Sequence, residues 1–275
     1  VCWASASRVL KNDMMESNVQ NATMPSSRWS QEDRGVLRCC IAYNQYGGYC
    51  VPDSSRDRPA ARSVLAGEVW EPSTIEFMVG RVGRGDIVHA GTFFGDFLPA
   101  LSRACADGAK VWAFEPNPEN HRCASITVAV NGLQNVELMN AALGEESGLL
   151  PLQISDESGS ALGGVSRLVL RPPPGDSKHF TKVQVVRLDD VVPPERPVSI
   201  LQLDVEGFER QALTGAMATI QRCRPILILE DMPGADWLGR NLFRLGYQVF
   251  GSVHGNTLLM AADPGTTKEV DGLCS

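Results

Sequence analysis

The stretch GDIVHAGTFFGDFLPALS, residues 85–102, decides the fold of this chain. It predicts a buried strand over 87–90, a tight glycine turn over 91–95 and a helix that begins near Asp96. Glycine adopts the positive φ angles that such a turn needs and lets a ligand approach the backbone closely. The free N–H groups in the first turn of the helix then point toward that ligand. The stretch therefore predicts a binding site for a nucleotide-like cofactor.

The composition is that of an ordinary globular protein. The chain has 275 residues, 43% of them hydrophobic and 21% charged, which predicts one large domain or one domain with an appendage. A net charge of −7 and a pI near 5.2 argue against a nucleic-acid binder, which usually has a basic face. No run is long and apolar enough to cross a membrane, and the first residues lack the pattern of a secretory signal. We therefore expect a cytoplasmic protein without nucleic-acid or membrane partners.

The cysteines are scattered and form no CxxC pair. They are Cys2, Cys39, Cys40, Cys50, Cys105, Cys123, Cys223 and Cys274. Several lie within apolar helical or strand patterns, so we expect reduced, mostly buried thiols. The ligand spacing of a metal cluster is missing, and we predict no metal site.

Outward from the glycine turn, apolar runs of strand length alternate with helical patterns. Strands are expected over 110–115, 135–140, 149–154, 182–187, 199–205, 226–230, 247–253 and 258–262. Helices are expected over 71–82, 96–106, 117–131, 208–223 and 235–245, with a long loop rich in Gly, Ser and Pro over 155–181. This alternation predicts an α/β fold whose sheet is mostly parallel, with helices on both faces and one antiparallel strand.

The N-terminal quarter of the chain has a different pattern. Residues 1–34 are polar and irregular, and 35–52 place β-formers around a turn at 44–48, which predicts a β-hairpin. A polar loop is expected over 54–62. We expect an N-terminal extension over 1–70 and a cofactor-binding domain over 71–275. The hairpin is also a candidate contact for a homodimer.

In an open parallel sheet, ligands bind beyond the carboxyl ends of the strands. Glu115 ends the strand after the glycine turn, where an acid can accept both hydroxyls of a ribose. Pro116 and Pro118 around a capping Asn117 fix the loop that follows it. The alternative for Glu115 is an ordinary surface glutamate.

Acidic residues also follow the strand over 199–205, in the run Asp204-Val205-Glu206-Gly207. Carboxylates at this edge can remove a proton, orient a hydroxyl or an amine, or hold a cation. The alternative is that they are helix N-terminal acids that complement the helix dipole, which explains Asp204 least well. His254, in the expected last hairpin turn, is a further candidate base.

Four segments, in this order, carry a family likeness: IVHAGTFFGDF, VWAFEPNPEN, NAALGEESG and LQLDVEGFE. Together they resemble the FkbM-type methyltransferases, class I enzymes that use S-adenosyl-L-methionine (SAM), and the likeness covers roughly 47–262. The resemblance implies a seven-stranded, doubly wound Rossmann-like sheet in a SAM-binding methyltransferase domain over 71–275. It also implies O-methylation of a hydroxyl on a sugar, polyketide or similar small metabolite.

The resemblance assigns the site residues position by position. The cofactor-binding residues are His89, Gly91, Thr92, Phe93, Gly95, Asp96, Glu115, Pro116, Asn117, Asn140, Ala141 and Asp204. The two glycines border the methionine part of SAM, Glu115 takes the ribose hydroxyls, and Asn140 or Ala141 flanks the adenine. The catalytic candidates are Asp204, Glu206 and His254, with Asp204 as the preferred base.

One departure from the family pattern is the histidine at position 89, where the family usually has an aspartate that supports the ammonium end of SAM. A protonated histidine cannot do this, and a neutral one accepts through one nitrogen only. Either Asp96 or Asp204 supplies the charge, or SAM affinity is reduced. Two rival functions are an NAD-type Rossmann oxidoreductase and a SAM-binding protein that has lost catalysis.

Overall fold

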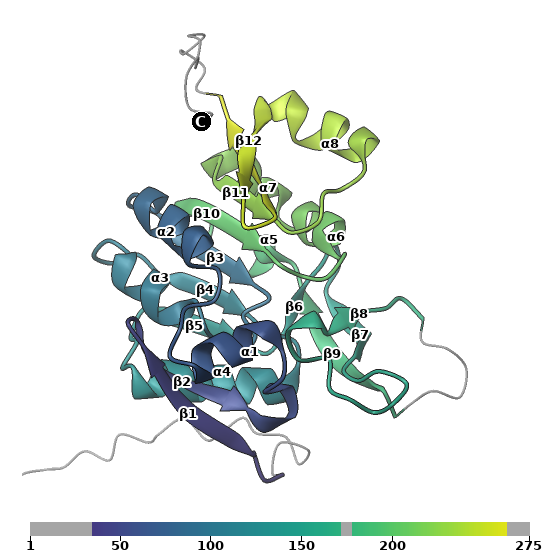
Figure 1. Cartoon of the computed structure of the whole chain (residues 1–275). Coiled ribbons are helices and arrows are strands. Elements are labelled where there is room, and N and C mark those ends of the chain that lie inside the picture. The colour runs from purple at the N-terminus through teal and green to yellow at the C-terminus, as the bar shows by residue number, and fades with distance from the viewer. Residues whose placement is uncertain (1–34, 172–177, 263–275) are drawn as a thin grey trace, which may run out of the picture. The chain divides into compact units, whose positions relative to one another are not determined.

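A seven-stranded sheet is the centre of the computed structural model, which describes residues 35–171 and 178–262 (Figure 1). The strands lie in the order β12-β13-β11-β10-β3-β4-β5. Their bounds are β3 Asp86–Ala90, β4 Val111–Phe114, β5 Val136–Met139, β10 Val198–Leu203, β11 Ile226–Leu229, β12 Tyr247–Val253 and β13 Asn256–Ala261. The strands from β11 to β5 are parallel to one another, and β13 is antiparallel to both of its neighbours. This topology confirms the predicted mostly parallel sheet with one antiparallel strand.

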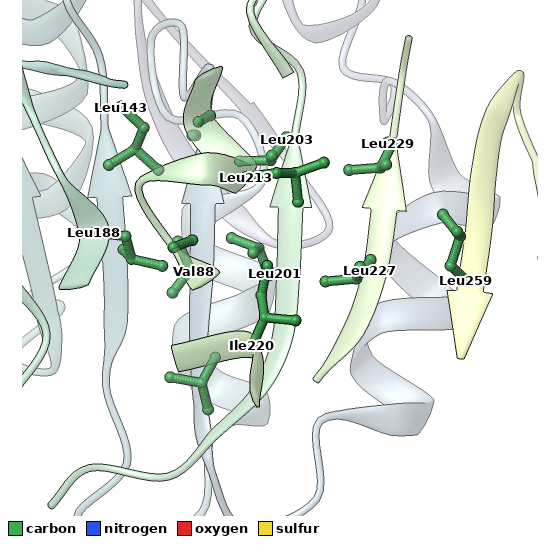
Figure 2. Packing of buried hydrophobic residues seen from close by; sticks show 14 of the residues in the cluster. Val88, Leu143, Leu188, Leu201, Leu203, Leu213, Ile220, Leu227, Leu229 and Leu259 are labelled. Atoms are coloured by element: carbon green, nitrogen blue, oxygen red, sulfur yellow. The ribbon is translucent and has the colours of Figure 1, made fainter. Parts of the chain in front are cut away.

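Helices on one face of the sheet bury a large apolar cluster (Figure 2). They are α5 Leu188–Val191, α6 Glu209–Thr214, α7 Met217–Cys223 and α8 Ala235–Asn241, the last followed by a 3₁₀ turn, η4 Phe243–Leu245. Leu213 and Ile220 from α6 and α7 pack against Val88, Leu201 and Leu227 of the strands. Strands that are covered on both faces have nearly continuous apolar sequences, and this pattern made them easy to predict.

The opposite face is covered by α2 Pro72–Arg81, α3 Leu98–Ala104 and α4 Pro118–Val130. Ile75 and Met78 of α2 and Leu98 of α3 pack here against Ile87 and Ile200 of the sheet. The start of α4 is as predicted: the Asn117 side chain accepts a hydrogen bond from Glu119 N, and Pro118 is the first helical residue. The doubly wound architecture is therefore confirmed.

The helix expected over 208–223 is wrong in one respect, because it is two helices that break at Gly215. A β-carbon at Gly215 would overlap the carbonyl oxygen of Gly144, so this position needs glycine for close approach. The second helix, α7, is capped by Asp189, which accepts from Ala218 N at 2.9 Å and Thr219 N at 2.8 Å. Both causes are tertiary contacts that the helical pattern alone does not contain.

The predicted N-terminal hairpin is confirmed as β1 Cys39–Asn44 and β2 Gly47–Pro52. It packs against α4, where Cys50 N donates to Thr127 Oγ1 at 3.0 Å, and it belongs to the compact unit that begins at Leu37. The polar loop expected over 54–62 is wrong, because this region holds a 3₁₀ turn, η2 Asp53–Ser55, and helix α1 Pro59–Leu65. Residues 1–34 lie outside the described residues. The domain boundary near residue 70 and the homodimer stay predictions.

Two of the predicted strands form a separate four-stranded sheet, in the order β6-β9-β7-β8. Its strands are β6 Ala142–Leu143, β7 Gly148–Gln153, β8 Arg167–Leu168 and β9 Phe180–Val186. The segment expected as a long loop over 155–181 contains β8 and a 3₁₀ turn, η3 Gly163–Val165, while 172–177 lie outside the described residues. This insertion between β5 and β10 supplies one wall of the site described below.

The described cysteines are free thiols, as expected. Only Cys50 and Cys123 are buried, and the other four are partly exposed, so the expectation of mostly buried thiols is wrong for this part of the chain. Among the helices over 35–171 and 178–262, none combines the length and the apolar character that crossing a bilayer requires.

Candidate functional site

The glycine turn joins the end of β3 to α3 and lies against the end of β10. Gly91 has φ +88°, and a β-carbon there would overlap the carbonyl oxygen of Asp204. Gly95 has φ +85°, and its missing side chain leaves room for Leu98 and Thr127. The helix begins at Leu98, two residues later than expected, so Asp96 lies in the turn rather than in the helix. The turn is therefore fixed by close approach of β3 and β10, as well as by glycine's conformational freedom.

Glu115 ties the end of β4 to this turn. Its Oε2 accepts from Phe93 N at 2.8 Å, and its Oε1 accepts from Asn117 N at 2.8 Å and from Asn120 Nδ2 at 3.4 Å. Burial raises the pKa of Glu115 to about 8, although these hydrogen bonds act in the opposite direction. Asn140 Nδ2 donates to the Glu115 carbonyl oxygen at 2.8 Å and so holds the loop after β4.

An apolar pocket lies beside Glu115, with an empty volume of about 430 Å³ that includes open solvent. Its apolar lining combines strand ends with the insertion: Ala90, Phe114, Ala141, Ala142, Leu143, Leu152, Leu168, Val205 and Phe208. Its other lining residues are Gly91, Glu115, Pro116, Gly164, Ser166 and Asp204. A flat apolar ring attached to a hydroxylated sugar suits this combination of walls.

A second pocket, which we call the acid-lined cavity, has an empty volume of about 970 Å³ that includes open solvent. Five carboxylates line it, those of Glu71, Asp96, Asp204, Glu206 and Glu230, together with a single guanidinium, that of Arg58. The remaining lining residues are Pro59, Ala60, Trp70, His89, Gly91, Phe93, Phe97, Gly164, Val165 and Gln202. It shares Gly91, Gly164 and Asp204 with the apolar pocket, so the two spaces meet beside the glycine turn.

Three of these acids form a cluster at the ends of β10 and β11. Carboxylate oxygens of Asp204, Glu206 and Glu230 lie within 4.8 Å of one another. Burial and the nearby Glu230 raise the pKa of Asp204 well above its usual value. Burial and the same neighbour raise the pKa of Glu206 to about 7. Like charges in a partly desolvated site make ionisation costly, so at least one of these groups is poised to hold a proton near neutral pH.

His89 lies in the acid-lined cavity on β3. Its Nδ1 forms a hydrogen bond with Gln202 Oε1 of β10, and its ring stacks on Phe97 at 5.2 Å between centroids. Burial lowers the pKa of His89 to about 4, so the ring is neutral at pH 7. Its Nε2 is buried and has no hydrogen-bond partner among the described residues. A polar occupant of the cavity would satisfy this atom.

Residues 87–249, more than half of the chain, match the family model described as the Methyltransferase FkbM domain. The chain belongs to the FkbM methyltransferase family. Its cofactor is S-adenosyl-L-methionine, and the sheet has the Rossmann-like form of the class I methyltransferases. No protein with a curated description matches the sequence.

Several solved structures resemble this FkbM methyltransferase more distantly. The methyltransferase FkbM from Methylobacillus flagellatus is 19% identical with a TM-score of 0.41, over 64% of this chain and 43% of that one. A SAM-dependent methyltransferase from Aquifex aeolicus is 16% identical with a TM-score of 0.38, over 76% and 96%. A tRNA (uracil-54, C5)-methyltransferase from Pyrococcus abyssi is 12% identical with a TM-score of 0.38, over 78% and 41%. At these scores the likenesses are weak, and the family rests on the match of residues 87–249.

The described residues of this FkbM methyltransferase fit SAM on two observations. Glu115 lines the apolar pocket with accepting capacity left over, because a carboxylate offers about four acceptor sites and three hydrogen bonds use part of them. On the other side of Gly91, the orphaned His89 Nε2 and the carboxylates of the second cavity suit a cationic, hydrogen-bond-donating group.

The predicted cofactor residues fall into two groups. Lining residues are His89, Gly91, Phe93, Asp96, Glu115, Pro116, Ala141 and Asp204. Thr92, Gly95, Asn117 and Asn140 line neither pocket and instead hold the turn and the loop; Thr92 Oγ1, for example, donates to the His89 carbonyl oxygen at 3.2 Å. The roles of all these residues toward SAM stay predictions.

The three predicted catalytic residues are not equally placed. Asp204 and Glu206 line the acid-lined cavity together, with Glu206 at φ +54°. His254 lines neither pocket; it is exposed in the β12–β13 turn, 5.5 Å from the Trp70 ring and 4.0 Å from Glu71. Because Trp70 and Glu71 line the cavity, His254 lies behind its rim rather than inside it.

Sequence reasoning missed Glu71, Arg58 and Gln202 as lining residues. Glu71 precedes α2 with φ +47° and accepts from Thr74 Oγ1 at 2.9 Å and Asn256 Nδ2 at 3.1 Å. A polar residue within an apolar strand was an available signal for Gln202. Nothing local distinguishes Glu71 or Arg58, which reach the site only through the fold.

Proposed function

We propose that this FkbM methyltransferase transfers the methyl group of SAM to a hydroxyl oxygen of a small metabolite such as a sugar or a polyketide. The observation that carries the proposal is the meeting of the two spaces at Gly91 and Asp204. The apolar pocket beside Glu115 is the proposed place of the adenosine, and the acid-lined cavity takes the methionine end and the acceptor. The methyl group would then lie where the two spaces join.

When bound, SAM supplies a strongly electrophilic sulfonium methyl group, so the protein mainly aligns the reactants and excludes water. The Asp204 carboxylate takes the proton of the acceptor hydroxyl as the new carbon–oxygen bond forms and S-adenosylhomocysteine leaves. Burial and the nearby Glu230 raise the pKa of Asp204, which makes its carboxylate a stronger base than that of an exposed aspartate. Glu206 orients the acceptor, and His254 is the alternative base at the rim.

The charge of the cavity supports a small acceptor over a nucleic acid. Five carboxylates and one guanidinium line it, and the chain carries a net charge of −7. A polyanion would be repelled, since nucleic-acid binding depends on basic residues that neutralise phosphates. We extend the proposal to a cytoplasmic setting, which the free thiols at the described cysteines support.

Calorimetric titration with SAM and with S-adenosylhomocysteine tests the cofactor part. We expect micromolar binding, about −8 kcal/mol, with at least tenfold weaker binding for Glu115→Gln and unchanged binding for the surface variant Glu137→Gln. Folded protein that binds neither ligand would contradict the proposal, and equal binding by Glu115→Gln would remove the ribose assignment.

Transfer of a tritiated methyl group to a panel of hydroxylated metabolites tests the chemistry. We expect label in at least one hydroxylated acceptor and no absorbance change at the nicotinamide band when NAD is supplied. SAM binding without transfer to any acceptor in the panel would favour the rival in which catalysis has been lost.

A further inference from the structure

The acid cluster is built by two neighbouring strands that end together. In the parallel pairing of β10 and β11, Leu203 lies opposite Leu229, so the next residues, Asp204 and Glu230, leave the sheet side by side. Glu206 follows at φ +54°, which turns the chain back over this edge. As a result, carboxylate oxygens from all three acids come within 4.8 Å of one another. Such a separation lets three oxygens contact one ion.

No basic side chain among the described residues forms an ion pair with this cluster, although Arg58 lines the same cavity and Arg167 acts on Glu206 from a greater distance. Over residues 35–171 and 178–262, no lysine, arginine or histidine forms an ion pair with Asp204, Glu206 or Glu230. By contrast, the buried Asp86 is bound by Arg196 in bidentate fashion. Asp204 and Glu206 are half-buried and Glu230 is exposed, so these three carboxylates without an ion-pair partner can accept a cation from outside the protein.

A second observation, independent of the acids, also points to an occupant of this space. His89 is only 3% exposed and lines the same cavity, and its Nε2 has no partner among the described residues. With the Gln202 amide oxygen facing Nδ1, the ring donates through Nδ1 and keeps a lone pair on Nε2. That lone pair suits a donor such as a water or a hydroxyl held in the cavity.

We infer that Asp204, Glu206 and Glu230 form a binding site for a hard divalent cation such as Mg²⁺ or Mn²⁺. Oxygen-only ligands of this kind select hard cations over the softer metals that prefer thiolate or imidazole. In the sequence, Asp204 with Glu230 or Asp231 is a possible ligand set for a divalent metal, but no metal site is predicted because the sequence shows no geometry. In the structure, strand pairing brings Asp204 and Glu230 together.

The site has a function in the reaction, and this part rests on the proposed methyl transfer. Three protein oxygens leave about half of an octahedral coordination sphere open toward the cavity. An acceptor hydroxyl that binds there becomes more acidic, because a divalent cation stabilises the oxyanion. The cation thus offers a reason for placing so many carboxylates where an acceptor is expected.

Titration of the full chain with Mn²⁺, followed by electron paramagnetic resonance and calorimetry, tests the site directly. We expect one Mn²⁺ per chain, competition by Mg²⁺, and at least tenfold weaker binding in both Glu230→Gln and Glu206→Gln. Asp231→Asn is the matched control, because it removes the adjacent carboxylate outside the cluster; we expect its Mn²⁺ affinity within twofold of wild type. Thermal unfolding, measured in parallel, shows that each variant is folded.

Folded wild-type protein that binds no Mn²⁺ at millimolar concentration would overturn the site, and so would glutamine variants that bind it as tightly as wild type. An equal loss in Asp231→Asn would overturn this set of ligands. Methyl transfer that persists in EDTA, without Mn²⁺ binding, would sink the cation site but leave the proposed function standing. Mn²⁺ binding with no methyl transfer to any acceptor would support the cation site but contradict the proposed function.

Discussion

Two acids on neighbouring strands, the buried Asp86 at the amino ends and the half-buried Asp204 at the carboxyl ends, have contrasting surroundings. Asp86 begins β3 and accepts hydrogen bonds from Arg196 Nε at 2.6 Å, Trp112 Nε1 at 2.7 Å and Lys110 N at 2.9 Å. Burial alone would raise the pKa of Asp86, but these hydrogen bonds hold it below its usual value. Asp204, after β10, instead faces other carboxylates, and burial with Glu230 raises its pKa.

The difference separates stability from function. At the amino edge of the strands the fold supplies every partner that the buried charge needs, so this acid stabilises the folded state. At the carboxyl ends of the strands, several carboxylates lie close together without an ion-pair partner among the described residues. Their mutual repulsion lowers stability and favours the binding of a ligand. Sites that bind and react are commonly built at such a cost to stability.

The largest expected effect is on the rate of methyl transfer, and it follows from replacing Asp204 at the carboxyl ends of the strands. Asp204→Asn keeps the shape of the side chain but removes the proposed base, so we expect methyl transfer to fall by about 10²–10⁴-fold. Initial rates at saturating concentrations of the labelled methyl donor measure this, and thermal unfolding is the control that the variant is folded. A rate within tenfold of wild type would show that Asp204 is not the base.

The next largest effect is on stability, and it follows from replacing Asp86 at the amino ends of the strands. Asp86→Asn leaves the Arg196 guanidinium without its carboxylate, and we expect the free energy of unfolding at pH 7 to fall by about 3 kcal/mol. Because the folded-state pKa of Asp86 is lowered, its contribution is present above the unfolded-state pKa of about 4 and lost as pH falls further. Urea unfolding at pH 7 and pH 3.5 measures both; a loss that does not shrink at low pH would contradict this account.

A smaller effect on stability, in the opposite direction, is expected at Glu206, where a substitution should stabilise the folded state. Its folded-state pKa of about 7 lies above the ordinary value of 4.5, so ionisation costs stability as pH rises through that range. In EDTA at pH 8 we expect Glu206→Gln to be roughly 1 kcal/mol more stable than wild type, with the gain vanishing near pH 4. Thermal unfolding at the two pH values tests this, and destabilisation at pH 8 would show that the cluster is balanced after all.

The smallest effect is expected at the ion pair between Lys110 and Glu137, 2.6 Å apart. Their side chains are 36% and 48% exposed, so water screens both charges. We expect Glu137→Gln to change stability by less than about 0.5 kcal/mol, since exposed pairs contribute little. A loss as large as that of Asp86→Asn would mean that burial does not explain why the pair of Asp86 and Arg196 stabilises the fold.

Some of the site could be predicted because its signals are local. The turn at Gly91, the strand end at Glu115 and the cap at Asn117 each depend on a few consecutive residues, and the structure has the turn, strand and cap where they were expected. The sequence predicts the start of α3 near Asp96, whereas the helix begins at Leu98 and the preceding Phe97 packs in the apolar cluster with Ile87 of the sheet.

Other parts could not be predicted, because they depend on residues far apart in sequence. The break at Gly215 comes from contact with Gly144, and Glu71 reaches the cavity from a helix that precedes the whole sheet. Gln202 stands out as a polar residue within an apolar strand, but only the fold shows that it lines the cavity and contacts His89.

The sequence by itself determined the alternation of strands and helices, the glycine turn and the carboxylates at strand ends, because periodicity and turn chemistry act over a few residues. The tertiary structure alone decided which of those carboxylates meet. Strand order sets Glu230 beside Asp204 without an ion-pair partner among the described residues, whereas it gives Asp86 the guanidinium of Arg196. Charge balance depends on spatial neighbours, and only the folded chain specifies these.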